Sequence, residues 1–443
     1  MSEQALFTLD LNRCTGCSAC SIACRTENDV GSGLGWRHVY TFNEAHLPNA
    51  GVFHFSLACN HCAEPACLYG CPAKAYTKDE RTGAVLLDHD HCIGCRYCSW
   101  VCPYGAPQYN PLTRVMEKCT FCSHRLAEDL EPACVTACPV DALGFAHRGE
   151  PDTARHPGFP DVGLRPGLHL TAKRRHSAPP EMTPLPESDL ADLPAAPSAS
   201  IELADEWPLL AFTLVASILV AWFTASAAGS RPPNPIAFAL VAGSALAVST
   251  LHLGRPLRAW RAVLNIRHSW LSREVASFSA FAGLALVSTT LGPLPQPLQW
   301  LTVALGFTAL FSVDMVYRVP GQSEPAVPHS AMTTLTAAYL LGLMIGDPIL
   351  ALAAGSIKLV LYGVRVPRQR LGSWPAILRI AGGFLLPLAL WLLYPSGPVG
   401  LLLAGPLLGE LIDRIEFYSG LGFLSPQRQI DLDLEAMTRP TLS

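Results

Sequence analysis

Residues 92–103 read CIGCRYCSWVCP, which places four cysteines at the spacing C-x2-C-x2-C-x3-C and ends on a proline. The same spacing occurs near the N-terminus, in residues 14–24. Two further groups are spaced differently, and they consist of Cys59, Cys62, Cys67 and Cys71 and of Cys119, Cys122, Cys134 and Cys138. All 16 cysteines of the chain lie between Cys14 and Cys138, so they serve one local purpose.

The C-x2-C-x2-C-x3-C run is the spacing of bacterial ferredoxins, in which three thiolates hold one [4Fe–4S] cube and the fourth ligates another. Steps of two residues turn three sulfurs toward one cube, while the fourth cysteine, at the start of a helix, points toward a neighbouring cube. Pro72, Pro103 and Pro139 each follow the last cysteine of a group, as this motif expects. The spacing therefore predicts clusters whose ligands are exchanged between paired groups.

Zinc sites and disulfides are the two alternative uses of these cysteines. Pairs of C-x2-C also form tetrahedral zinc sites, but close quartets with trailing prolines favour iron–sulfur clusters. The start MSEQALFTLD has no basic n-region, apolar h-region or twin arginine, so we expect the cysteine-rich region to mature in the cytoplasm. That expectation and the short spacings favour metal ligation over disulfides.

The second half of the chain has the composition of a membrane domain. No residue from Leu209 to Ala228 is charged, and such a run is long enough to cross a bilayer as a helix. Further candidate spans lie at about 235–253, 274–292, 297–318, 330–346, 347–364, 376–394 and 397–416. So many apolar runs leave too little polar surface for a soluble domain, so we predict an all-α transmembrane bundle of about eight helices.

Basic residues separate between the two sides of such a bundle. One side carries Lys173, Arg174 and Arg175 before the first span, Arg255, Arg258, Arg261, Arg267 and Arg273 in a loop at 254–273, and Arg365, Arg368 and Arg370 in a loop near 365–375. The opposite connections offer only Arg231. The positive-inside rule then predicts a multi-pass protein of the inner, cytoplasmic membrane, with both termini and the cysteine-rich region on the cytoplasmic side.

The stretch from about 148 to 206 is rich in proline, which excludes a long helix or a central strand there. We expect its first part, to about residue 176, to wrap the cysteine-rich region, and the part that follows to be a disordered linker. The predicted domains are an α+β cluster domain at 1–176, a linker at 177–206, a membrane domain at 207–420 and a tail at 421–443. A net charge of -4 provides no basic face, so we expect no nucleic-acid partner.

With its four cysteine groups, the region 5–176 resembles the four-cluster iron–sulfur subunit of the dimethyl sulfoxide reductase family of molybdenum oxidoreductases. The resemblance implies two ferredoxin-like units, and it pairs the first group with the last and the second with the third. Four [4Fe–4S] clusters are implied, because no cysteine of the third group is replaced. Their implied ligands are Cys14, Cys17, Cys20 and Cys138; Cys24, Cys119, Cys122 and Cys134; Cys59, Cys62, Cys67 and Cys102; and Cys71, Cys92, Cys95 and Cys98.

The membrane domain, about residues 207–420, resembles the anchor subunit of the same family. The resemblance is carried by LHLGRPLRAWRAVLNIRHSWLSREV at 251–275 and, more weakly, by GELIDRIEFYSG at 409–420. It implies menaquinol oxidation, with functional residues at the positions of His252 and Glu274. A histidine can accept a proton near neutral pH, and a carboxylate at a helix N-terminus is held ionised by the helix dipole. Both residues are alternatively ordinary interface residues that satisfy the loop backbone.

Together the resemblances imply an electron-transfer and membrane-anchor subunit, two functions that relatives divide between separate chains. It would oxidise menaquinol and pass electrons through four clusters to a molybdopterin-containing catalytic subunit that reduces dimethyl sulfoxide or a related S- or N-oxide. An equivalent quinone-linked module of a polysulfide, thiosulfate or nitrite reductase is the alternative. A transporter with clusters as sensors is a second alternative, with little support because the spans show no evident internal repeat.

Charged residues inside the spans carry further predictions. Lys358 lies within the sixth span, where an ammonium is costly, so we expect it to pair with a carboxylate; proton conduction is the alternative. Asp314 with Arg318, and Glu410 with Arg414, have the spacing of i,i+4 pairs on a helix.

Overall fold

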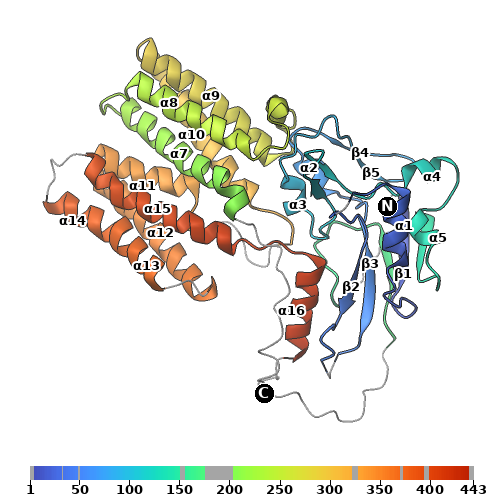
Figure 1. The fold of residues 1–443 in the computed structure, drawn as a ribbon. Helices are drawn as coiled ribbons and strands as arrows, with labels where there is room; N and C mark the ends of the chain where they lie inside the picture. Colours follow the sequence, from blue (N-terminus) through green and yellow to red (C-terminus); the bar gives the residue numbers. More distant parts are fainter. Residues whose placement is uncertain are drawn as a thin grey trace. The chain divides into compact units, whose positions relative to one another are not determined.

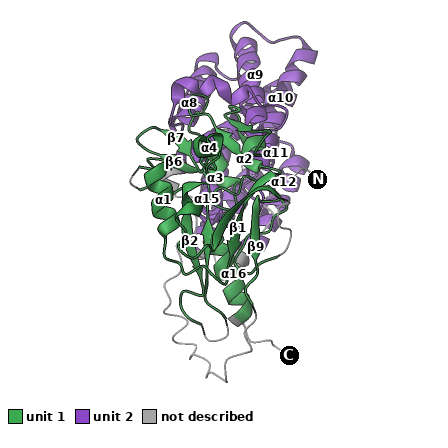
Figure 2. Ribbon diagram, turned by 90° about the vertical axis from the view of Figure 1, so that its right-hand side faces the viewer, with its two compact units in different colours: residues 1–199, 423–443 green, residues 200–422 purple. Residues whose placement is uncertain are grey.

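The computed structural model describes residues 4–31, 33–47, 50–149, 155–174, 203–321, 328–369, 373–393 and 399–438 of the chain. The chain forms two compact units (Figure 2). Unit 1 consists of Met1–Ala199 and Phe423–Ser443, and unit 2 of Ser200–Gly422. The predicted linker falls largely outside the described residues, and helix α7 already begins at Leu203.

Unit 1 is built on short strands, as the α+β prediction requires (Figure 1). Strand β1 (Gln4–Asp10) lies between antiparallel β8 (Leu143–Gly149) and parallel β9 (Leu168–Thr171). The three remaining sheets are hairpins: β2 (His38–Phe42) with β3 (Phe53–Leu57), β4 (Tyr76–Lys78) with β5 (Val85–Leu87), and β6 (Gln108–Asn110) with β7 (Val115–Glu117). The central sheet thus ties together the two ends of the cysteine-rich region.

Short helices carry or adjoin the cysteines. They are α1 (Ala19–Glu27), α2 (Ala66–Gly70), α3 (Tyr97–Trp100), α4 (Ser123–Ala127) and α5 (Ala133–Thr136). In both ferredoxin-like runs the loop before the helix turns through two left-handed residues, Gly16 and Ser18 in the first and Gly94 and Arg96 in the third group. With this turn, the first three cysteines of each run line one cavity. The predicted place of the fourth cysteine at the start of a helix was wrong, because Cys24 lies inside α1 and Cys102 follows the end of α3.

The C-terminal segment belongs to unit 1 and is not an extended tail. Helix α16 (Pro426–Thr438) buries Ile430 in the same apolar core as Phe7 and Phe55. Its Asp433 accepts a hydrogen bond of 2.6 Å from the Gly158 backbone. Just before the helix, Phe423 stacks on Trp100 of α3, with ring centroids 5.5 Å apart. The sequence prediction of a tail at 421–443 did not include this helix.

Unit 2 is entirely helical in its described part (Figure 1). Its elements are α7 (Leu203–Ala227), α8 (Pro235–Leu251), η1 (Pro256–Val263), α9 (Trp270–Thr290), α10 (Gln296–Val316), α11 (Thr333–Ile345), α12 (Pro348–Gln369), α13 (Ser373–Ile380), η2 (Ala381–Leu385), α14 (Leu386–Leu393) and α15 (Val399–Gly420). The π-helical turn η2 joins α13 to α14, so these three elements form one interrupted helix.

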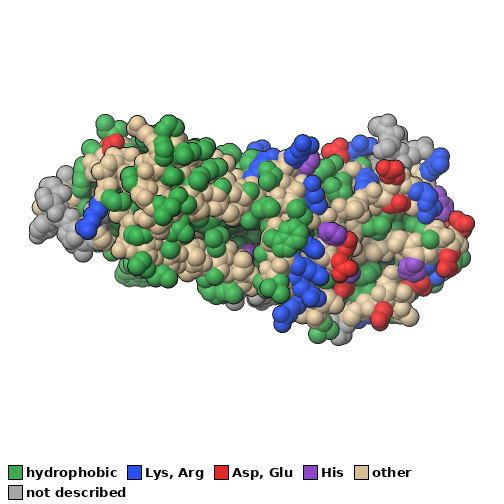
Figure 3. Space-filling model, turned by 90° about the horizontal axis from the view of Figure 1, so that it is seen from above, with side chains coloured by type: hydrophobic (Ala, Val, Ile, Leu, Met, Phe, Trp, Pro, Cys, Tyr) green, Lys and Arg blue, Asp and Glu red, His purple; other side chains and the backbone are tan. Residues whose placement is uncertain are grey.

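Helices occupy all eight stretches predicted to span the membrane, but fewer meet the length and apolarity of a crossing. In the described part of the chain, four helical segments do so, within α7, α10, α12 and the α13–α14 run, and α8 with η1 makes a fifth if this pair, bent by 103°, is one span. The number of crossings therefore stays a prediction. On the face shown in Figure 3, hydrophobic side chains gather over unit 2, whereas charged side chains gather over unit 1.

Candidate metal centres and candidate quinol site

Three cavities in unit 1 are each lined by four cysteines that come from two cysteine groups. One is lined by Cys14, Cys17, Cys20 and Cys138, one by Cys59, Cys62, Cys67 and Cys102, and one by Cys71, Cys92, Cys95 and Cys98. In each cavity, three cysteines of one group are joined by a cysteine of its partner group. The structure thus brings together three of the four ligand sets that the family resemblance implies.

The fourth set is gathered around the end of α1. Asn28 Nδ2 lies 3.6 Å from Cys122 Sγ and 3.9 Å from Cys24 Sγ, so one amide group contacts two cysteines from different groups. Burial raises the pKa of the Cys24 thiol to about 12, with a further contribution from nearby Cys134. Burial likewise raises the pKa of Cys102 to about 11. Loading such thiols with iron must release protons, since the thiolate is the ligand.

The donor arrangement fits an iron–sulfur cube better than a single ion. Zinc needs four donors about 2.3 Å from the metal. Among the described residues, which include every cysteine, no three His, Cys, Asp or Glu side chains converge closely enough to hold one ion. The cysteines instead surround cavities, as is expected for ligands of a cluster that is larger than a single ion. A [4Fe–4S] cluster bound there would transfer single electrons.

Several polar residues around the cysteines were not singled out by the sequence. Ser56 Oγ lies 3.1 Å from Cys20 Sγ, and it also accepts a hydrogen bond of 3.0 Å from Arg37. Both Arg37 and Lys118 are only 3% exposed. An arginine or lysine between cysteine motifs has no distinctive spacing, so only the fold reveals that these two are buried.

His252 and Glu274 lie at the two ends of the connection that carries η1. His252 caps the C-terminus of α8, and Glu274 lies in the first turns of α9, whose N-cap is Ser269. Glu274 is 7% exposed and lies near Asp314 of α10 and Tyr317 just beyond it. Tyr317 shares a hydrogen bond with Tyr418 of α15. An acid and two phenols thus gather beside the predicted quinol loop.

A second polar cluster lies among α11, α12, α13 and α15. Lys358 Nζ lies 3.0 Å from Glu410 Oε2, which confirms the expected pairing of Lys358 with a carboxylate. Asp413 lies 2.5 Å from both Arg365 and Arg379. The placement of Arg365 among the loop charges was therefore wrong, because it is a buried residue of α12.

The two i,i+4 pairs predicted on α10 and α15 are replaced by contacts to other helices. Asp314 accepts hydrogen bonds from the backbone and hydroxyl groups of Thr333 and Thr334, at the start of α11. Glu410 pairs with Lys358, and Arg414 donates to Thr213, Ser217, Thr336 and the Ala331 carbonyl. Both predictions placed within one helix a contact that the structure makes between helices.

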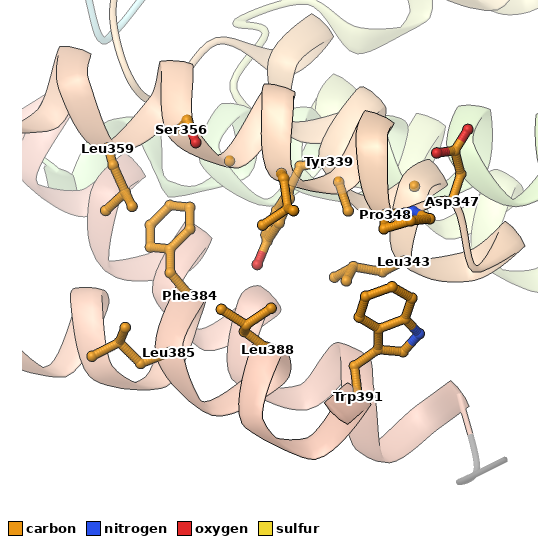
Figure 4. A pocket seen from close by; sticks show the side chains of 14 residues that line it. Tyr339, Leu343, Asp347, Pro348, Ser356, Leu359, Phe384, Leu385, Leu388 and Trp391 are labelled. Atoms are coloured by element: carbon orange, nitrogen blue, oxygen red, sulfur yellow. The ribbon is translucent and has the colours of Figure 1, made fainter. Parts of the chain in front are cut away.

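An apolar cavity adjoins this cluster, between α11, α12 and the interrupted helix (Figure 4). Leu343, Phe384, Leu388 and Trp391 point into it. The hydroxyl of Tyr339, which also lines the cavity, donates a hydrogen bond of 2.8 Å to the Gly383 carbonyl. Most of the lining is apolar, which suits the cavity to hydrocarbon, and Asp347 contributes a carboxylate to it.

The fold and the cysteine cavities define an iron–sulfur electron-transfer protein with a helical membrane anchor. Comparison with known proteins agrees: residues 50–148 match the family of 4Fe-4S dicluster domains, and residues 203–366 match the DMSO reductase anchor subunit family (DmsC). The chain belongs to the dimethyl sulfoxide reductase family, as an iron–sulfur subunit fused to an anchor.

Three relatives illustrate the similarity. A sulfite dehydrogenase subunit of Allochromatium vinosum is 36% identical over 226 residues, which cover 43% of this chain and 94% of the relative. The probable anaerobic dimethyl sulfoxide reductase chain YnfG of Escherichia coli K12 is 40% identical over 179 residues, 39% of this chain and 86% of the relative. Another anaerobic dimethyl sulfoxide reductase chain of the same organism is 40% identical over 181 residues, with the same coverage.

Proposed function

We propose that this chain oxidises menaquinol in the membrane and conducts the electrons through four [4Fe–4S] clusters to a separate molybdopterin-containing subunit. The observation that carries the proposal is the set of cavities lined by cysteines of two groups each. Ligands exchanged in this way hold neighbouring clusters close together, as stepwise electron transfer needs. All 16 cysteines are assigned as ligands, including Cys24, Cys119, Cys122 and Cys134.

His252 and Glu274 are the proposed proton acceptors of the quinol site. Oxidation of a quinol releases two electrons and two protons, so the site needs groups that take protons from phenolic hydroxyls. Glu274 is buried near Asp314, and its neighbours Tyr317 and Tyr418 supply hydroxyl groups of the kind that orient a quinone oxygen. His252 closes the helix on the other side of the same connection.

The course of the chain supports an even number of membrane crossings, as the proposed eight would be. Residues 177–200, which precede the first span, include no apolar run long enough to cross a bilayer. At the other end, α15 ends at Gly420 and the chain rejoins unit 1 at Phe423. Both ends of the bundle thus connect to the same unit. The loop arginines from Arg255 to Arg273 favour the cytoplasm for that side.

The terminal reaction is proposed by analogy with the relatives. Two of those described are chains of anaerobic dimethyl sulfoxide reductases, which favours a catalytic partner that reduces dimethyl sulfoxide or another S- or N-oxide. The similarity to a sulfite dehydrogenase subunit favours a second candidate, in which a partner oxidises a sulfur compound and electrons flow toward quinone. Both candidates use the same ligands and the same quinol site.

Anaerobic purification of the full complex from membranes tests the proposal. Iron analysis should give about sixteen irons per chain, and mass spectrometry should identify a co-purified molybdenum subunit. Addition of a menaquinol analogue should reduce the clusters in the wild-type complex but not in His252→Ala, while dithionite reduces both. Zinc in place of iron would refute the cluster assignment. Normal reduction of the His252→Ala complex by the quinol would remove this residue from the site.

A further inference from the structure

Two buried cations have no carboxylate partner within the described part of unit 1. Arg37, just before β2, and Lys118, just after β7, are each 3% exposed. Among the described residues neither forms an ion pair with an Asp or Glu side chain. An uncompensated buried charge is costly, so a negative charge must lie close to each of them.

The contacts of Arg37 direct its charge toward cysteine sulfurs. Its Nη1 donates to the carbonyl and the hydroxyl of Ser56, at 2.9 and 3.0 Å, while Nε and Nη2 have no oxygen or nitrogen acceptor in the described part of the chain and the guanidinium lies beside the Cys134 thiol. Ser56 Oγ in turn lies 3.1 Å from Cys20 Sγ, and Cys134, Cys119, Cys20 and Cys24 are the cysteines close enough for their charges to act on the guanidinium. Three of these four cysteines belong to the set Cys24, Cys119, Cys122 and Cys134.

Lys118 lies beside a different set. It lines the cavity formed by Cys59, Cys62, Cys67 and Cys102. Its Nζ donates to two carbonyl groups, those of Val85 and Cys119, the second at 3.0 Å. Carbonyl dipoles solvate an ammonium but do not neutralise it. The ammonium therefore also requires a negative partner, and the cavity beside it is where that partner would be.

We propose that Arg37 and Lys118 are counter-cations of two adjacent clusters, and that each raises the reduction potential of its own cluster. Cube and thiolates together carry net negative charge, which becomes more negative by one unit on reduction. A fixed buried cation stabilises the added electron more than the oxidised state, because the interaction is weakly screened inside the protein. Cys119 lies near Cys59, so two clusters held by these sets would be neighbours.

The inference rests on the proposed four-cluster function, and a redox titration of the full complex tests it. Electron paramagnetic resonance should resolve the midpoint potentials in the wild type and in Arg37→Met and Lys118→Met. We expect each substitution to lower the midpoint of one cluster, and a different one in each variant. In Arg37→Lys and Lys118→Arg, which keep the charge, the midpoint potentials should stay close to the wild-type values. Lys74→Met, at an exposed cation three residues after Cys71, is the matched control and should shift no midpoint.

Unchanged midpoints in fully loaded Arg37→Met and Lys118→Met would overturn the inference and leave the four-cluster function intact. A shift of the same cluster in both variants would also overturn it. Fewer than four clusters in the wild type would instead refute the function. Where a methionine variant fails to assemble, the neutral Arg37→Gln or Lys118→Gln variant takes its place: a lowered midpoint of one cluster supports the counter-cation role, and four wild-type midpoints refute it.

Discussion

Lys358 Nζ lies 3.0 Å from Glu410 Oε2, and both side chains are buried inside unit 2. Thr336 completes the contact, because its hydroxyl donates to Glu410 at 2.6 Å and accepts from Lys358 at 3.0 Å. Each charge is therefore both paired and hydrogen-bonded, which is the condition under which ions are tolerated in a low-dielectric interior.

Glu410→Ala should destabilise the bundle strongly, because it leaves the Lys358 ammonium buried without a counter-charge. Breaking one partner of a buried pair costs about 3–5 kcal/mol. The midpoint temperature of unfolding of the purified complex in detergent, compared with wild type, measures the effect. Arg318→Met is the control, since Arg318 is exposed at the end of α10 and its loss should be nearly neutral. Equal midpoints for Glu410→Ala and Arg318→Met would contradict the prediction.

Cys102→Ser should remove one cluster and leave the other three. Cys102 lines the cavity of Cys59, Cys62 and Cys67, although it lies in the third cysteine group of the sequence. About four of about sixteen irons should be lost, measured by iron analysis and by the disappearance of one paramagnetic signal. The exposed Arg81→Ala variant should keep its full iron content. If the lost signal were instead the one that Cys98→Ser removes, the assignment of Cys102 would be wrong.

Glu274→Gln should stop reduction of the clusters by quinol without changing the iron content. The substitution keeps the shape of the side chain but removes its ability to accept a proton. Anaerobic stopped-flow reduction with a menaquinol analogue should slow by about 100-fold or more, the range for loss of a general base. Dithionite should still reduce the clusters. Arg231→Ala, exposed in the connection between α7 and α8, should react at the wild-type rate; a fast Glu274→Gln enzyme would exclude this carboxylate.

Ile430→Ala should destabilise unit 1, although the residue follows the membrane domain in the sequence. Ile430 is 1% exposed and packs in the core that contains Phe7 and Phe55. Removing its side chain from a packed core costs about 2–5 kcal/mol. Leu432→Ala, two residues away on α16 and 38% exposed, is the matched control with a small expected cost. The loss of cluster absorbance on heating measures the stability of both variants. Identical heating curves for Ile430→Ala and Leu432→Ala would show that α16 does not stabilise this unit.

The sequence predicted the α+β character of the first unit and the helical character of the second. It also singled out the cysteines that line the three cavities, since metal ligation imposes a spacing that can be read directly. It failed on the helix α16, whose apolar residues are too few to predict a docking partner. It also failed on Glu410, because the helix-spacing rule suggested Arg414 and not Lys358 as its partner.

The failure at Glu410 has a simple energetic reason. A surface i,i+4 pair contributes only a few tenths of a kcal/mol, whereas leaving a buried lysine unpaired costs several times more. Glu410 therefore pairs with Lys358, because Lys358 is buried and needs a counter-charge. The same reason explains Arg365, which the sequence placed in a basic loop and the structure places beside Asp413.

The sequence by itself determined that the second half of this protein is a membrane domain and that the cysteines of the first half are metal ligands. Apolar run length and cysteine spacing are local properties of the chain, so both can be read directly. The tertiary structure decided which charges are buried and what compensates them. Arg37, Lys118, Lys358 and Ile430 acquire their roles from residues that are distant along the chain. Burial depends on such contacts, so no local pattern could have revealed it.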